Sequence, residues 1–133
     1  MSFGRFLPPD YSRGDESTVG GYAAVHGRAA ALEGKDGLSY SLEVLADETG
    51  DSTRPFGAYL LFLQWRRVGE QGIEAHLETE FLAYGDSADA AMAIVRGTTL
   101  TECQRLLDAL IAARDGAGNR RRWVDVMRED DST

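Results

Sequence analysis

The chain has 133 residues, a length typical of a single domain that buries a core without disulfides or structural metals. Its formal net charge of −8 counts against a general nucleic-acid binder, because such proteins gain affinity by neutralising phosphates with basic side chains. The single cysteine, Cys103, excludes an internal disulfide and a cysteine-based zinc cage, and no apolar run approaches the roughly 20 residues of a membrane helix.

We interpret residues 1–18 as an N-terminal arm. Pro8 and Pro9 interrupt regular structure, and the stretch SRGDEST at 12–18 is polar and typical of a loop. The arm lacks a basic start followed by an apolar stretch, so we expect no secretory signal and a cytoplasmic location. Its aromatic residues leave two alternatives open: the arm docks on the domain or a partner, or it frays.

A single α+β domain is expected over residues 19–127, followed by a disordered acidic tail at 128–133. The domain contains two similar turns, GKDGL at 34–38 and GEQGI at 69–73, which fit three-residue hairpin loops that end in a left-handed glycine. The two hairpins predict an antiparallel meander of about four strands, at residues 20–33, 38–47, 57–68 and 73–84.

The turns also predict how the strands pair. In the first hairpin, Leu32 lies opposite Tyr40. In the second hairpin, Trp65 lies opposite Leu77. Both registers gather apolar side chains on one face of the sheet, so Trp65 is expected to point into the protein interior.

A helix is expected after the second hairpin. The stretch GDSADAAMAIVRG at 85–97 offers Asp86 or Ser87 as an N-cap and Gly97 as a stop. Its alanine-rich composition favours a helix, and a fifth strand is the alternative.

The next segment is the clearest helix in the sequence. Thr101 and Gln104 fit a capping box, and Gly116 or Gly118 fits the C-terminal end. The apolar stripe of this helix consists of Cys103, Leu106, Leu107, Leu110 and Ile111. Residues 119–127 form either a short helix or a last strand. One or two C-terminal helices are therefore expected to pack on one face of the sheet.

The second strand pair carries the most chemically active side chains. Glu74, His76, Glu78 and Glu80 alternate along one predicted strand and share one face, with neighbours about 6.6 Å apart. Arg66 is expected opposite His76, where a metal site needs another donor. We interpret the row as a solvated charged face and keep a metal or acid–base site on Glu74, His76 and Glu78 as the lesser alternative. No cofactor is expected.

Away from the turn, the same face becomes apolar. Phe62 is followed by Leu60 opposite Leu82, and then by Tyr84. A half-apolar face needs a cover, because large apolar patches on soluble proteins mark contacts. Cover by the arm or by residues 119–127 is one alternative. The other is a homodimer interface made of Leu60, Phe62, Leu82 and Tyr84.

The remaining candidate residues fit structural roles better than chemical ones. His26 is the only other histidine and fits an ordinary hydrogen-bonded side chain of a strand. Cys103 lies on the apolar stripe of a helix, which argues against a Cys–His nucleophile. One basic cluster consists of Arg120, Arg121, Arg122 and Trp123. It has the chemistry to hold single-stranded nucleic acid by charge and stacking, but a basic linker is the simpler interpretation.

These features predict a small acidic interaction or structural module without catalytic activity, which self-associates as a homodimer. Its acidic surface would also suit a basic protein partner. One alternative is a ligand-binding or enzymatic domain whose pocket, between sheet and helices, holds His26 or His76 beside a carboxylate. The other is a single-strand nucleic-acid binder that uses the basic cluster, although the acidic balance argues against nucleic acid as a partner. No contact with a membrane is expected.

Overall fold

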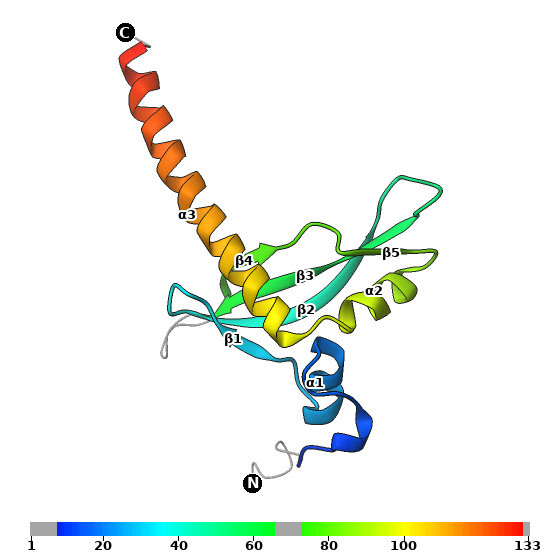
Figure 1. Ribbon diagram of the computed structural model, residues 1–133. Coiled ribbons are helices and arrows are strands. Elements are labelled where there is room, and N and C mark those ends of the chain that lie inside the picture. The colour runs from blue at the N-terminus through cyan, green and yellow to red at the C-terminus, as the bar shows by residue number, and fades with distance from the viewer. Residues whose placement is uncertain (1–7, 66–72, 132–133) are drawn as a thin grey trace.

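The computed structural model describes residues 8–65 and 73–131, and within them the chain forms one antiparallel sheet with helices on one side (Figure 1). The elements in chain order are η2 (Tyr11–Arg13), α1 (Val19–His26), β1 (Ala31–Glu33), β2 (Ser39–Glu48), β3 (Phe56–Trp65), β4 (Ile73–Glu78), β5 (Ala83–Gly85), α2 (Ala88–Arg96) and α3 (Leu100–Asp131). The strand order is β1-β2-β3-β4, and β5 pairs with β3 beyond the end of β4. The predicted α+β class is confirmed.

The first hairpin matches its prediction. Leu32 lies opposite Tyr40, and the Gly34 N–H donates to the Leu38 carbonyl over 2.8 Å. Gly37 has a φ of 80°, the left-handed conformation that the turn requires and that glycine adopts without strain. The local turn chemistry therefore determines the register of β1 and β2.

The predicted strand at 20–33 is wrong in its first half, which is helix α1. The Thr18 side chain caps this helix by accepting from the Gly21 N–H over 3.0 Å, and Gly27 ends it with a φ of 66°. Gly21 lies so close to the preceding loop that a Cβ there would be 1.8 Å from the Asp15 carbonyl oxygen. Only β1 remains of the predicted strand.

The arm from Pro8 to Thr18 docks on the domain. The Asp10 N–H donates to the carbonyl of Val25 in α1, and the Leu100 N–H donates to the carbonyl of Ser17. Of the two alternatives for the arm, docking therefore holds for this described part.

The predicted register of the second hairpin is wrong by three residues from Leu61 to Gln64, and beyond an irregularity in the pairing Trp65 lies opposite Ile73. Leu77 was expected opposite Trp65, but it lies opposite Phe62, and His76 lies opposite Leu63. A shift by an odd number exchanges the faces of a strand. Trp65 is consequently 46% exposed rather than interior, whereas Phe62 is fully buried. The predicted turn at 70–72 and the predicted pairing of Arg66 lie outside the described residues.

The predicted strand at 73–84 is interrupted between β4 and β5. The Thr79 N–H donates to the Leu60 carbonyl and the Leu82 N–H to the Ala58 carbonyl. Between these two hydrogen bonds, Glu80 and Phe81 lie opposite a single residue of β3, Tyr59. The extra length forms a bulge, and it raises Phe81 over the sheet.

Both C-terminal helices begin at a side-chain cap. The Ser87 hydroxyl accepts from the Ala90 N–H, which confirms the prediction of a helix rather than a fifth strand. In α3 the cap is Thr99, whose hydroxyl accepts from the Glu102 N–H, and not Thr101 as predicted. The true pattern, Thr99 followed three residues later by Glu102, also fits a capping box.

Helix α3 is longer than predicted. It continues through Gly116 and Gly118 to Asp131, so residues 119–127 are helical, as are residues 128–131, which were expected in the tail. A glycine inside an exposed helix costs only about 1 kcal/mol and need not end it. The C-terminal half of α3 extends away from the sheet (Figure 1). Among the described residues, no helix combines the length and apolar character needed to span a membrane.

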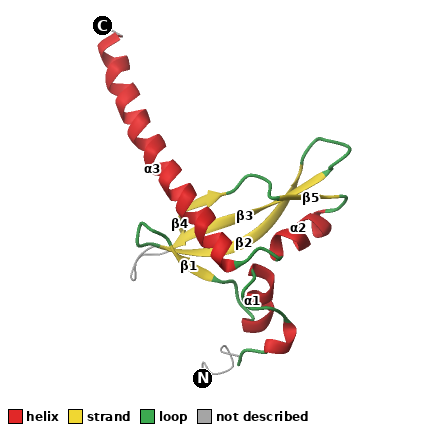
Figure 2. Ribbon diagram, in the orientation of Figure 1, coloured by secondary structure: helices red, strands yellow, loops and turns green. Residues whose placement is uncertain are grey.

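The core lies between the helices and one face of the sheet (Figure 2). Even-numbered residues of β2 and β3 point into it, because side chains alternate along a strand. Its fully buried members include Tyr40, Leu60, Phe62, Val95, Cys103, Leu107 and Ile111. The predicted stripe on α3 is therefore confirmed as the buried side of that helix.

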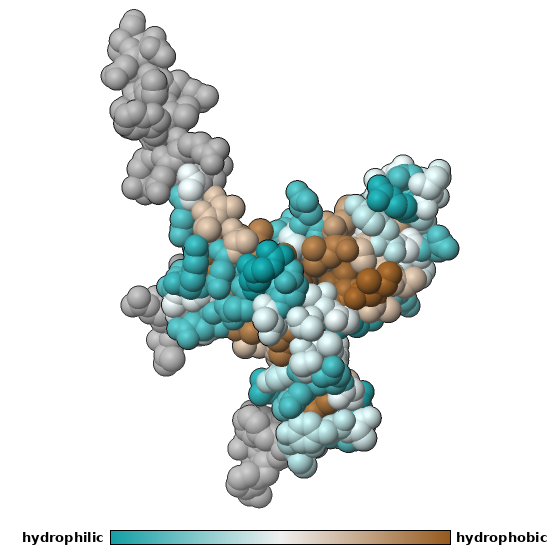
Figure 3. Space-filling view, viewed as in Figure 1, coloured by the Kyte–Doolittle hydropathy of each residue, from teal (hydrophilic) through white to brown (hydrophobic). Residues whose placement is uncertain are grey.

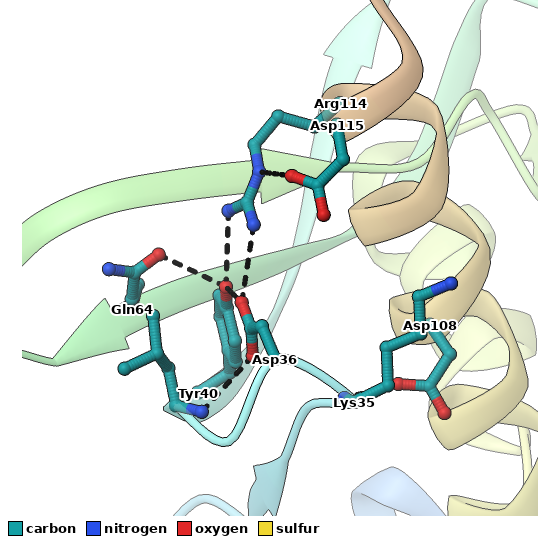
Figure 4. Close-up of polar contacts among 8 residues, drawn as sticks. Lys35, Asp36, Tyr40, Gln64, Asp108, Arg114 and Asp115 are labelled. Carbon is teal, nitrogen blue, oxygen red and sulfur yellow. Dashed lines mark hydrogen bonds and ion pairs between the residues drawn. The ribbon is translucent and has the colours of Figure 1, made fainter. Parts of the chain in front are cut away.

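A polar cluster joins α3 to the first hairpin (Figure 4). The Tyr40 hydroxyl lies 2.7 Å from Asp36 Oδ2 and 3.0 Å from Gln64 Oε1, and Arg114 donates to both Asp36 and Tyr40. Partial burial acts to raise the pKa of Asp36, but hydrogen bonds from Tyr40, from a backbone N–H and from Arg114 outweigh it and lower the pKa. This cluster ties α3 to the first hairpin.

Candidate functional site

None of the described helices covers the other face of the sheet, which we call the open face (Figure 2). Its residues are Ser41, Glu43, Leu45 and Asp47 of β2, Tyr59, Leu61, Leu63 and Trp65 of β3, and His76 and Glu78 of β4. None of these residues is lysine or arginine.

The open face has an apolar centre and a polar border. Leu61 of β3 lies between Glu43 and Glu78, and Leu63 lies between Ser41 and His76. Leu61 and Leu63 are half-buried, whereas Leu45 is 37% exposed and Trp65 is 46% exposed. The indole N–H of Trp65 donates to the Ser41 hydroxyl over 2.9 Å, which lays the indole against β2. The strand therefore presents apolar surface to solvent on the side that none of the described helices covers.

A pocket of about 290 Å³ lies at the bulge end of the open face. We call it the acidic–aromatic pocket; it is lined by Asp47, Tyr59, Glu78, Thr79, Glu80 and Phe81. The rings of Tyr59 and Phe81 meet edge to face, with centroids 6.0 Å apart. Gly57 makes this arrangement possible, because a Cβ there would lie 2.5 Å from the Phe81 ring.

The pocket has a negative electrostatic environment. Three of its lining residues, Asp47, Glu78 and Glu80, carry carboxylates, and none is basic. The pKa of the Tyr59 hydroxyl is raised, first by burial and then by Asp47 and Glu78, whose negative charges disfavour a phenolate. A cationic group that enters the pocket would gain from the same charges.

The predicted interface residues do not form one surface. Leu60 and Phe62 are fully buried in the core, so α2 and α3 of the same chain cover them and they are not available to a partner. Leu82 is 40% exposed. Tyr84 lies opposite Gly57 at the edge of the open face, where the Arg54 guanidinium stacks 4.1 Å from its ring centroid. The prediction placed Leu60 and Phe62 on the outer face because its register was off by an odd number of residues. In the observed register they lie on the inner face.

The predicted metal or acid–base row is only partly described. His76 and Glu78 are exposed on the open face, and Glu80 is exposed in the bulge. The side chain of Glu74 lies outside the described residues. Within the described part of the chain, no three His, Cys, Asp or Glu side chains gather in a way that could hold a metal ion.

His26 lies beside a carboxylate, but not between the sheet and the helices. It is the last residue of α1, its Nε2 lies 2.9 Å from Glu16 Oε2, and its ring lies 4.2 Å from that of Tyr22. Cys103 is fully buried, and burial, followed by the charge of Glu102, raises its pKa to about 11. Neither residue therefore contributes to the open face.

The helix side of the molecule also has an exposed apolar feature. Figure 3 shows apolar surface around α2, where Ile94 is 61% exposed. The predicted nucleic-acid residues 120–123 lie on the helical backbone of α3, and their side chains are not among those described.

The sequence did not predict the acidic–aromatic pocket, because the strand predicted at 73–84 runs without interruption through Phe81, where the structure has a bulge. The available signal was Gly57, since a glycine inside a strand often marks a bulge or a close approach of another group. Comparisons with protein-family models, curated proteins and solved structures find no match for this chain.

Proposed function

We propose that the protein is a non-catalytic interaction module that binds a basic protein partner through the open face. The observation that carries the proposal is the exposed apolar surface of β3 with carboxylates on both sides of it. Protein interfaces combine an apolar, often aromatic centre with a polar rim. Trp65 is the type of residue that contributes most to such interfaces.

The charge of the open face favours a basic partner over a second copy of the chain. Two copies packed face to face would bury Glu43, Asp47 and Glu78 of each in an interface to which the residues of the open face contribute no lysine or arginine. Like charges held together at an interface cost several kcal/mol, and each copy already carries a formal net charge of −8. A basic partner gains from the same charges, both in affinity and in rate of association.

The proposal is tested with two matched substitutions. Trp65→Lys places a positive charge on the open face, and Ile94→Lys makes a comparable change at an exposed apolar residue of α2 on the helix side. A partner is first isolated with the wild-type chain from its host, identified and purified. Its affinity for the wild type and both variants is then measured by isothermal titration calorimetry at low and moderate salt.

We expect a basic partner whose binding weakens at least tenfold in Trp65→Lys, is unchanged in Ile94→Lys, and weakens as salt rises. Equal affinities in the two variants would overturn the proposal, as would a partner that is not basic. A chain that retains no partner after cross-linking would also count against it. Sedimentation velocity that shows a compact dimer, dissociated by Trp65→Lys, would assign the open face to a second copy instead.

A further inference from the structure

The acidic–aromatic pocket is part of the open face, but its chemistry is more specific than that of the apolar centre. It lies six residues along β3 from Trp65, roughly 20 Å at the usual rise of a strand. Tyr59 of β3 lines the pocket, and the bulge supplies Glu80 and Phe81. A partner that covers the open face would therefore also cover this pocket.

The pocket offers two kinds of contact to a cation. Asp47, Glu78 and Glu80 supply carboxylate oxygens, and Tyr59 and Phe81 supply aromatic rings. A guanidinium group uses both, because its planar fork donates two parallel hydrogen bonds to a carboxylate and its face stacks on aromatic rings. A lysine ammonium lacks the flat face and the fork.

The neighbouring ring shows this contact within the chain itself. Phe81 meets Tyr84 with ring centroids 5.8 Å apart, and Arg54 stacks on Tyr84 at 4.1 Å while it pairs with Asp51. This side of the sheet thus already holds one guanidinium between an aromatic ring and a carboxylate. In the pocket, the ring and the carboxylates are present and none of the lining residues is a cation.

The size of the pocket fits a side chain. Pockets for drug-sized ligands occupy about 300–1,000 Å³, and this one, at about 290 Å³, lies at the lower limit of that range. We propose that the acidic–aromatic pocket binds one arginine side chain of the partner, a step that rests on the proposed function of the open face. The guanidinium pairs with the carboxylates and stacks on Phe81.

The test uses three small probes on the full chain: N-acetyl-arginine amide, the corresponding lysine amide, and the corresponding citrulline amide, which keeps the shape of arginine without its charge. Binding is followed by ¹H–¹⁵N NMR titration at millimolar probe concentrations. Glu80→Gln removes one pocket carboxylate, and Asp86→Asn makes the same change at an exposed carboxylate outside the pocket. Both variants keep the size of the side chain.

We expect the arginine probe to shift the signals of Tyr59 and residues 79–81, the lysine probe to bind at least threefold more weakly, and the citrulline probe not to bind. Glu80→Gln is expected to weaken arginine binding at least fivefold and Asp86→Asn to leave it unchanged. Equal responses to arginine and citrulline, shifts confined to other surfaces, or no binding would overturn the inference.

The outcome also separates this inference from the function on which it rests. A partner that is lost in Trp65→Lys but retained in Glu80→Gln would leave the proposed function standing and remove the arginine pocket. If the pocket binds the arginine probe but the partner binds Trp65→Lys as tightly as the wild type, the arginine pocket would stand and the proposed function of the open face would fall.

Discussion

Leu60 and Leu61 are neighbours in β3 whose side chains lie on opposite faces of the sheet. Leu60 is fully buried in the core, and Leu61 is half-buried on the open face between two glutamates. Replacing each by alanine removes the same atoms from two different environments. The pair therefore measures directly which face of the sheet is the inner one.

The two losses are expected to differ by about 2 kcal/mol. A fully buried leucine replaced by alanine costs about 2–5 kcal/mol, because a cavity is left as well as the lost transfer free energy. Full burial of leucine is worth about 1.5–3 kcal/mol, so the half-buried Leu61 is expected to cost about 1 kcal/mol. For a domain of this size, roughly 4 °C in Tm corresponds to 1 kcal/mol, which gives about 12 °C for Leu60→Ala and about 4 °C for Leu61→Ala.

The assay is urea unfolding followed by circular dichroism, with the free energy of unfolding extrapolated to water. Equal slopes for both variants and the wild type would show that neither substitution changes the surface exposed on unfolding. A larger loss for Leu61→Ala would refute the reasoning. It would place Leu61 in the core, as the register predicted from sequence requires, and the open face would no longer exist.

Three further predictions concern the core and the helix caps. Asp36→Asn is expected to lower the free energy of unfolding at neutral pH. This loss is expected to shrink as the pH falls below 3.8, the ordinary pKa of an aspartate side chain, because a lowered pKa stabilises the fold only while the carboxyl is ionised. Urea titrations at neutral and acidic pH check this, and an equally large loss in acid would contradict it. Cys103 is expected to react with a thiol reagent at pH 8 only after unfolding, since it is fully buried and its pKa is about 11. Rapid labelling of the native protein, followed over time, would be inconsistent with that burial. Thr99→Ala is expected to cost about 1 kcal/mol in thermal or urea unfolding and Thr101→Ala only a few tenths, because Thr99 is the N-cap; equal costs would move the start of α3.

The parts of the fold that could be predicted depend on local chemistry. The turn at 34–38 determines its own register, because Gly37 must adopt a left-handed conformation and the strands leave from it directly. The cap at Ser87 and the apolar stripe of α3 are equally local, since they involve residues within one or two helical turns. In each case the information lies in a short stretch of the chain.

The second hairpin could not be predicted in this way because β3 is apolar on both faces. Leu60 and Phe62 alternate with Leu61 and Leu63, so apolar pairing alone favours neither face. Which face of β3 becomes the inner one depends on the described helices, which cover one face, and on the bulge that separates β4 from β5. Neither can be located from the strand itself.

Helix α1 was missed for a related reason. The predicted strand at 20–33 was extended outward from the turn at 34–38. Glycine is unfavourable in a helix by about 1 kcal/mol per residue, so Gly20 and Gly21 gave no local indication of α1. Tertiary packing explains why glycine occupies these two positions. A Cβ on Gly20 would lie 2.7 Å from the Arg96 side chain, and one on Gly21 would meet the Asp15 backbone. Close packing of α1 requires the residues that local propensity disfavours.

The same property of β3 connects the failed register to the proposed function. A strand that is apolar on both faces is usual where layers cover both sides of a sheet. Here the described helices cover one side, so Leu61, Leu63 and Trp65 face solvent without a second layer. The carboxylates along both borders determine what such a layer can be, because a cover that carries positive charge gains where an acidic one loses. Leu61 and Leu63, which helped to make the register ambiguous, are among the residues that we propose a partner covers.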